Sequence, residues 1–242
     1  MRALLVRGML AGLVAGLIYA IFAYVFGEPQ VDLAIAYEDQ VAAAAGEPAG
    51  EELVSRGVQS TVGLTVAAVV YGVAIGGIFA LVYALAQGRV GQLGARGTAA
   101  VLALLGFGAG YAVPFLKYPA NPPASSIDDT IGQRTGLYLA MVVLSVLLAV
   151  AAVVLRERLL AAWGGWNATL VAAGGYAVLV GIAMAVLPTI AETPADFPAT
   201  VLYEFRLASF AGQLALWTVL GVLFGALVER SPRGSRTAAG RS

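Results

Sequence analysis

The 242-residue sequence contains no cysteine and no histidine. Without cysteine there are no disulfides, no thiolate metal ligands and no thiol redox chemistry. Without histidine the chain lacks the commonest metal ligand and the side chain that titrates most readily near neutral pH. Zinc sites with nitrogen or sulfur ligands, and histidine-based acid–base catalysis, are therefore excluded within this chain.

Charge is also scarce. Only 12% of the residues are charged and 60% are apolar, whereas a soluble domain has roughly 25% charged residues. The mean hydropathy of +0.86 is typical of a chain that lies mostly in lipid. The formal net charge is zero, so bulk charge indicates no partner, and nucleic acid is not expected as one.

Six apolar stretches are long enough to be membrane spans, since a helix needs about 20 apolar residues to cross a bilayer. We interpret the first as an uncleaved helix rather than a signal peptide, because its apolar run is too long. The sequence thus predicts an all-α, polytopic membrane protein of one domain over residues 1–230, with a basic tail over 231–242. The predicted spans are about 4–26, 60–86, 98–116, 135–155, 168–188 and 207–228.

The distribution of charge predicts the orientation of these spans. With the N-terminus in the cytoplasm, ten of the fourteen basic residues fall inside and twelve of the fourteen acidic residues fall outside. The positive-inside rule favours this arrangement over its inverse. It places both termini in the cytoplasm and groups the spans as three hairpins. The location we expect is the cytoplasmic membrane of a bacterium. Glycines four residues apart, as at Gly8, Gly12 and Gly16, predict close helix packing, either within the chain or in a homo-oligomer.

The second and third hairpins share a repeated motif at their outer loops. YPANPP at 118–123 precedes Arg134, and TPADFP at 193–198 precedes Arg206; Gly-Glu-Pro at 27–29, with Arg56, is a more distant relative. The prolines are expected to end helices and turn the chain. Each arginine would pair with a nearby carboxylate, or the three would converge into a functional cluster. The nearby carboxylates are Glu52 for Arg56, Asp128 and Asp129 for Arg134, and Glu204 for Arg206.

Polar residues descend from two of these arginines at helical spacing. They could line a water-filled vestibule, or they could form hydrogen bonds between helices. On the second span the stripe is Arg56, Gln59, Gly63 and Ala67, and on the last it is Arg206, Ser209, Gln213 and Trp217. The candidate residues for a substrate pathway are accordingly Arg56, Gln59, Arg134, Tyr138, Arg206, Ser209 and Gln213.

The first outer loop, 27–59, is the longest and most acidic. Residues 29–45 within it are expected to form a short amphipathic helix. Clustered carboxylates suit hard divalent cations and can serve cobalt or nickel more weakly, although an acidic loop can also be simply solvated. The candidate metal ligands are Glu28, Asp32, Glu38 and Asp39.

Several segments together resemble the CbtA family of cobalt-transporter subunits. They are FAYVFGEPQVDLAIAYEDQ, EELVSRGVQSTVGL, PFLKYPANPP, DTIGQRTGLY and PADFPATVLYEFRLAS. The resemblance covers about residues 4–228. It implies cobalt uptake across the cytoplasmic membrane for corrinoid synthesis, together with CbtB, a small single-span subunit that carries histidines. Some relatives have histidine-rich outer stretches, which this chain lacks, so its own ligands for cobalt would be oxygen atoms.

Three functions remain open from the sequence. In the first, the chain is a subunit that transports a divalent metal, most readily cobalt as its substrate. In the second, it transports an anion or zwitterion through the arginines, whose planar fork binds carboxylate and phosphate. In the third, it is a scaffold that transports nothing. It is not expected to be an enzyme or to hold a cofactor. No Walker A motif occurs, so energy would come from the membrane potential or from a partner.

Overall fold

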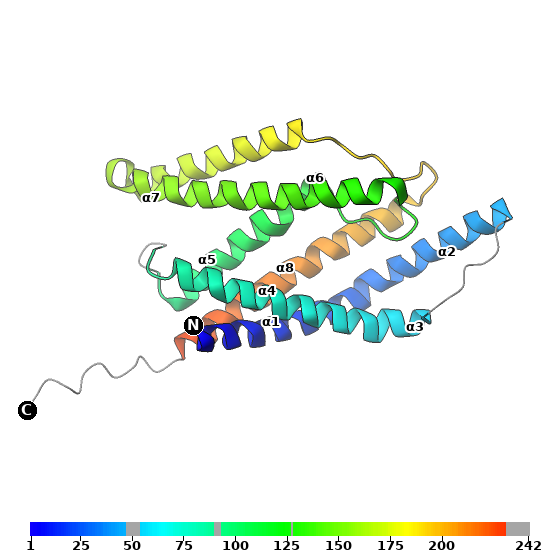
Figure 1. The fold of residues 1–242 in the computed structure, drawn as a ribbon, viewed down its shortest axis with the longest axis horizontal. Coiled ribbons are helices and arrows are strands. Elements are labelled where there is room, and N and C mark those ends of the chain that lie inside the picture. The colour runs from blue at the N-terminus through cyan, green and yellow to red at the C-terminus, as the bar shows by residue number, and fades with distance from the viewer. Residues whose placement is uncertain (47–53, 90–92, 127, 231–242) are drawn as a thin grey trace, which may run out of the picture. The chain divides into compact units, whose positions relative to one another are not determined.

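The computed structural model describes residues 1–46, 54–89, 93–126 and 128–230, and in this part of the chain all regular structure is helical (Figure 1). The expected all-α fold is confirmed. In chain order the elements are α1 (Arg2–Phe22), η1 (Ala23–Gly27), α2 (Glu28–Ala45), α3 (Arg56–Val58), η2 (Gln59–Gly63), α4 (Leu64–Ala86), α5 (Ala95–Phe107), η3 (Gly108–Ala112), α6 (Val113–Lys117), α7 (Asp128–Val186) and α8 (Ala199–Glu229).

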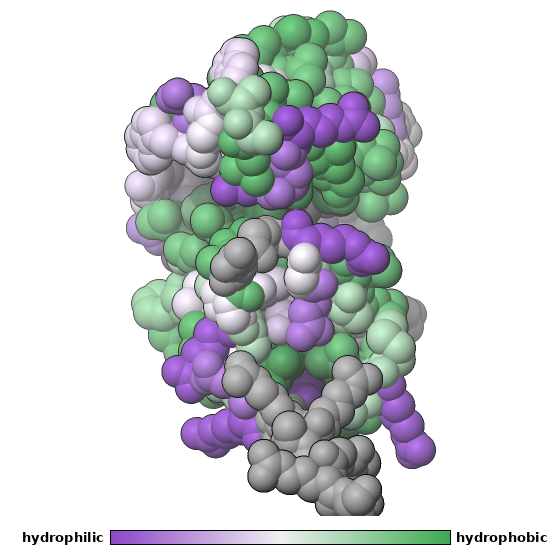
Figure 2. Space-filling view, turned by 90° about the vertical axis from the view of Figure 1, so that its left-hand side faces the viewer, coloured by the Kyte–Doolittle hydropathy of each residue, from purple (hydrophilic) through white to green (hydrophobic). Residues whose placement is uncertain are grey.

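The elements join into five helices that are long and apolar enough to cross a membrane. Their most apolar windows have mean hydropathies between 1.9 and 2.8. In these windows no more than 39% of the residues are buried within the protein, and apolar side chains make up much of the visible surface in Figure 2. The outward apolar faces need lipid around them, because each Å² of apolar surface left in water costs about 25 cal/mol. The five helices are Arg2–Ala45, Arg56–Ala86, Ala95–Lys117, Thr130–Val186 and Ala199–Glu229.

Helix α7 contains two of the expected spans. Its backbone leaves helical geometry at Gly164, where φ is 71° and ψ is 164°, a conformation that glycine adopts without steric cost. The chain folds back there, as Figure 1 shows. A 2.8 Å hydrogen bond joins the hydroxyls of Ser145 and Tyr176, and buried Met141 packs in one cluster with Val180. The two arms cover the predicted span 135–155 and all of 168–188 except its last two residues, and helical structure also extends over much of the expected loop between them.

The first helix does not end where expected. Pro29 was predicted to turn the chain, but it lies in the first turn of α2, which continues from α1 through the π-helical turn η1. Proline has no N–H and its ring crowds the carbonyl four residues earlier. The π turn accommodates both the missing N–H and the crowded carbonyl, because its hydrogen bonds run five residues back, as from Glu28 N–H to Ala23 O. Pro114 follows η3 in the same way, with Val113 N–H bonded to Gly108 O.

The chain divides into two compact units. The first comprises Met1–Tyr19, Thr65–Leu104 and Ala215–Ser242. In it, a Cβ added to Gly12 of α1 would overlap the backbone of Gly72 in α4, and one added to Gly225 of α8 would meet the backbone of Arg96 at 3.0 Å. The predicted packing of these glycines within the chain is confirmed. Buried aromatic rings complete this unit: Phe79, Tyr83 and Phe224.

The second unit comprises Ala20–Leu64 and Leu105–Leu214, and it holds all the residues of the candidate site. Phe197 and Val201 pack on Ala34 of α2 in one buried cluster. Aromatic rings of α5, η3 and α6 pack against Phe210 of α8, with centroids 5.4–6.3 Å apart. These contacts attach the loop segments to helices that have the composition of membrane spans.

Candidate functional site

Proline-rich segments bring the site together. Helix α6 ends at Lys117, where Tyr118 takes non-helical angles and YPANPP begins. The second arm of α7 ends at Val186, and a loop runs to the start of α8 at Ala199. The two loops are joined at their starts: Lys117 Nζ donates to Thr189 Oγ1 at 2.9 Å, and Tyr118 OH donates to Pro188 O at 2.7 Å. Burial also raises the pKa of the Tyr118 phenol. The prolines therefore end helices as predicted, and their loops pack on each other.

One buried carboxylate lies at the centre of this packing. Glu192 is 4% exposed. Its Oε1 lies 2.9 Å from Arg134 Nη1 and accepts hydrogen bonds of 3.3 Å from both Asn121 Nδ2 and Ser126 Oγ. Its Oε2 accepts a bond from Thr130 Oγ1. We call these five residues the Glu192 cluster. A buried charge is tolerated only when it is paired and hydrogen-bonded, and removing one partner of such a pair costs about 3–5 kcal/mol.

The guanidinium of Arg134 lies among oxygen atoms. Besides its ion pair with Glu192, its Nη1 donates to Ser126 Oγ at 3.2 Å and its Nη2 donates to Pro119 O. The expectation that Arg134 pairs with a carboxylate is met by Glu192, a residue far along the chain. The side chains expected as its partners, those of Asp128 and Asp129, lie outside the described residues.

Arg206 reaches the same cluster from α8. Its Nη2 donates to Asn121 Oδ1 at 2.7 Å and its Nε donates to Ala120 O at 3.3 Å. Asn121 thus bridges Arg206 and Glu192. The expected pairing of Arg206 with Glu204 is wrong: among the described ion pairs none includes Arg206, and Glu204 Oε2 accepts a 2.7 Å bond from Gln30 Nε2 instead. Two residues of spacing on one helix point these side chains away from each other.

Arg56 has its own carboxylates. It forms ion pairs with Glu28 and with Asp32, the latter at 2.9 Å. These partners lie four residues apart on α2 and so share one face. Burial lowers the pKa of Arg56, but the hydrogen bonds and charges of Glu28 and Asp32 together raise it by more. Both carboxylates were candidate metal ligands. Glu52, its expected partner, lies outside the described residues.

The acidic candidates do not form a metal centre in the described part of the chain. Glu28 and Asp32 are bound to Arg56, while Glu38 and Asp39 are exposed on α2. Among the described residues no three acidic side chains come close enough to hold a metal ion together. The amphipathic helix on which they were predicted to lie is present as α2.

The two predicted polar stripes differ in their exposure and in their hydrogen bonding. On the second span, Gln59, Gly63 and Ala67 are exposed, and Gln59 Nε2 donates to Val54 O at 2.6 Å, so no vestibule is lined by them in the described structure. On α8, Ser209 is partly buried. Gln213 is 8% exposed, and its buried Oε1 has no hydrogen-bond partner among the described residues. A buried polar atom without a partner costs free energy, so the described contacts give this oxygen no stabilising role.

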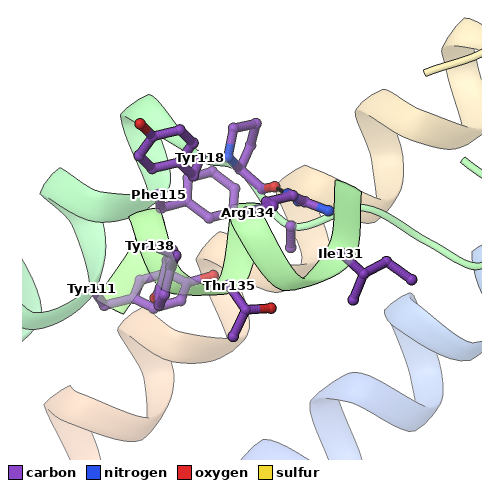
Figure 3. A pocket seen from close by; sticks show the side chains of 9 residues that line it. Tyr111, Phe115, Tyr118, Ile131, Arg134, Thr135 and Tyr138 are labelled. Atoms are coloured by element: carbon purple, nitrogen blue, oxygen red, sulfur yellow. Dashed lines mark hydrogen bonds between the residues drawn. The ribbon is translucent and has the colours of Figure 1, made fainter. Parts of the chain in front are cut away.

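A cavity of about 270 Å³ lies beside Arg134 (Figure 3). The candidate Tyr138 is part of its wall. In Figure 3 the aromatic rings lie together on one side, and the guanidinium of Arg134 points away from them. A pocket with a mainly apolar wall and a few polar groups is the usual form of a small binding site. The wall comprises Tyr111, Phe115, Tyr118, Pro119, Ala120, Ile131, Arg134, Thr135 and Tyr138.

Sequence reasoning missed the acceptor side of the site. It singled out the arginines, but not Glu192, Ser126 or Thr130. One signal was available: Glu192 stands immediately before TPADFP, and Asn121 stands within YPANPP, so each copy of the repeat carries an oxygen-bearing residue next to its prolines. The sequence does not show that the loop of each copy binds the arginine that follows the other copy.

The helices and their composition define a multi-pass membrane protein. Residues 1–229 match the family described as "Probable cobalt transporter subunit (CbtA)", so the chain belongs to the CbtA family of membrane cobalt-transporter subunits. The resemblance deduced from the sequence is thereby confirmed. Searches of curated proteins and of solved structures found no match.

Proposed function

We propose that the chain is the membrane body through which a divalent metal, cobalt, enters the bacterial cytoplasm to supply corrinoid synthesis. The observation that carries this proposal is the match of residues 1–229 to the cobalt-transporter family, in a chain with five long helices of membrane-spanning composition. Cobalt is the substrate in this proposal, and no resident cofactor is involved.

The proposed topology has six spans in three hairpins, one membrane domain over residues 1–230, and both termini in the cytoplasm. The fold-back of α7 at Gly164 supports six crossings, because it supplies two arms where one long helix would supply one. The excess of arginine in the segments assigned to the cytoplasm supports the orientation. The Glu192 cluster then lies on the outer side, where the metal arrives.

Oxygen atoms would have to bind the metal within this chain, because it has neither histidine nor cysteine. Such ligands hold cobalt weakly compared with imidazole. We therefore propose that a small single-span subunit of the CbtB type contributes histidines and selectivity. The membrane potential attracts a divalent cation inward by about 4.6 kcal/mol per 100 mV, twice the value for one charge.

The geometry favours cation transport over the alternative of anion transport. Arg56 and Arg134 are each paired with carboxylates, and Arg206 donates to a backbone carbonyl and an amide oxygen. An anion at Arg56 or Arg134 would have to displace a bound carboxylate. A cation that replaced Arg134 would instead meet the carboxylate Glu192 and further oxygen atoms.

Uptake of radioactive cobalt tests the proposal. Cells that lack their own cobalt transporters would express the chain alone, or with a small histidine-bearing membrane subunit, and an empty vector serves as the control. Uptake above the control in either case supports the proposal. If cobalt uptake stays at the control level with and without the subunit, although the protein is present in the membrane, the functions that remain are the anion transporter and the scaffold.

A further inference from the structure

Arg134 occupies a position suited to a metal ion. Its guanidinium contacts Glu192 Oε1 at 2.9 Å and Ser126 Oγ at 3.2 Å, and it also binds Pro119 O. These are a carboxylate, a hydroxyl and a backbone carbonyl, three of the oxygen types that hard divalent cations take as ligands. We propose that the Glu192 cluster is the first binding site for the partly hydrated divalent cation, and that the cation binds there by displacing the guanidinium of Arg134. This inference rests on the proposed transport of a divalent metal.

The oxygen atoms of the cluster form one set around a single buried carboxylate. Glu192 supplies two of them, and Ser126 Oγ and Thr130 Oγ1 each bond to that carboxylate. Pro119 O accepts from Nη2 of the guanidinium, whereas Glu192 and Ser126 contact Nη1. One carboxylate with a few neutral oxygens leaves room for water ligands, which is how small divalent cations are often held. The site binds weakly, as a site must if its ion is to move on.

Charge explains why the guanidinium and the metal alternate. Glu192 has a 2% exposed side chain and needs a cation beside it at all times, because an unpaired buried carboxylate is costly. The same oxygens cannot contact both cations, and two positive charges in one small site repel each other. Arg134 holds the Glu192 carboxylate in place until the metal arrives. It also lowers the apparent affinity, because only the fraction of molecules with a released Arg134 can bind.

The released guanidinium has a place to go. Arg134 itself lines the cavity of about 270 Å³, together with the rings of Tyr111, Phe115, Tyr118 and Tyr138 (Figure 3). Aromatic faces attract a guanidinium through their quadrupole. Rotation of the side chain toward the rings takes it from the oxygen set into this cavity. Arg206, bound to Asn121 and Ala120, holds YPANPP in place while Arg134 moves.

Calorimetric titration with CoCl₂ tests this inference on the full-length protein in phosphatidylcholine nanodiscs. Glu192→Gln should weaken binding at this site about tenfold or more, because it removes the only carboxylate of the set. Arg134→Gln should tighten binding about tenfold, because it removes the competing cation. Glu204→Gln is the matched control, since Glu204 belongs to the same unit but bonds to Gln30, and it should bind like the parent.

Loss of folding is controlled by a double variant. Arg134→Gln leaves Glu192 unpaired and can unfold the loops, in which case CoCl₂ should raise its midpoint of thermal unfolding more than that of the parent. Arg134→Gln combined with Glu192→Gln removes both charges, and this variant should fold but show no response at the site. Unchanged binding in Glu192→Gln, or equal or weaker binding in folded Arg134→Gln, would overturn the inference.

Cobalt uptake by the same variants separates this inference from the proposed function. If the parent takes up cobalt and Glu192→Gln does so equally well, the binding site is wrong and the transport function stands. If the parent takes up no cobalt with or without a histidine-bearing subunit, the transport function itself fails.

Discussion

Arg206 and Asn121 lie 85 residues apart in the sequence and are joined by a 2.7 Å hydrogen bond from the guanidinium to the amide oxygen. Arg134 makes the reciprocal connection, since its partner Glu192 precedes the second copy of the repeat. The arginine that follows each proline-rich copy thus binds a residue of the other copy's loop. The repeat is a pair of loops that support each other.

The Arg206 bond should be important for stability. Arg206→Gln removes the donors to Asn121 and Ala120, and a hydrogen bond to a charged group contributes about 1.5–3 kcal/mol. We expect a lower midpoint of thermal unfolding in nanodiscs. Arg230→Gln is the control, because Arg230 is exposed at the end of α8. Equal midpoints for the two variants would show that the bond contributes little.

The glycine contact between α1 and α4 leaves no room for a methyl group. Gly12→Ala would place a Cβ against the backbone of Gly72, and neither backbone can yield without separating the helices. We expect a loss of stability of about 1–3 kcal/mol, the usual effect of overpacking. Gly174→Ala in α7 meets nothing within 4 Å and should be neutral or stabilising, because alanine favours helix. Thermal unfolding followed by size-exclusion chromatography compares them.

The proposed topology can be tested with single cysteines, because the chain has none of its own. Ala195 is exposed in the loop before α8, and Ala161 is exposed near the turn of α7. A membrane-impermeant maleimide added to intact cells should label Ala195→Cys and spare Ala161→Cys until the cells are opened. The reverse pattern would invert the orientation, and labelling of both in intact cells would refute the six-span arrangement.

Gln213 should matter for transport more than for folding. Its buried amide oxygen has no hydrogen-bond partner among the described residues, so Gln213→Leu should leave stability unchanged or raise it by about 1 kcal/mol. If α8 lines the path of the metal, the same change should lower cobalt uptake severalfold. Ser145→Ala is a useful comparison, because Ser145 is buried but bonded to Tyr176. Loss of its hydroxyl should affect stability, whereas the cobalt uptake per folded molecule should stay unchanged. Normal uptake by Gln213→Leu would remove this residue from the pathway.

Much of the fold follows from local chemistry and was predictable. Long apolar runs predict helices in lipid whatever their neighbours are, and α2 was predicted from residues 29–45. The glycine spacings predicted contacts that exist between α1 and α4. The prolines of YPANPP end a helix as proline usually does.

The remaining features depend on tertiary placement. Pro29 was expected to turn the chain, but the π turn before it lets the helix continue, and no residue pattern announces such a turn. Arg134 had close acidic neighbours in sequence, yet its described partner is Glu192 from another loop. The choice of partner is made by the loops that pack together, and a single sequence does not show which loops those are.

The π turns have a mechanical consequence. Three helices pass from one compact unit to the other near Tyr19, Leu64 and Leu104, and η1, η2 and η3 lie within a few residues of these points. Helices bend at π turns, because these turns interrupt the regular hydrogen-bond pattern of the α-helix around them. Three of the helices with the composition of membrane spans therefore each contain a point at which the helix can bend, whereas α8 is described as one continuous α-helix. Each of the three can change direction at its π turn without having to unfold.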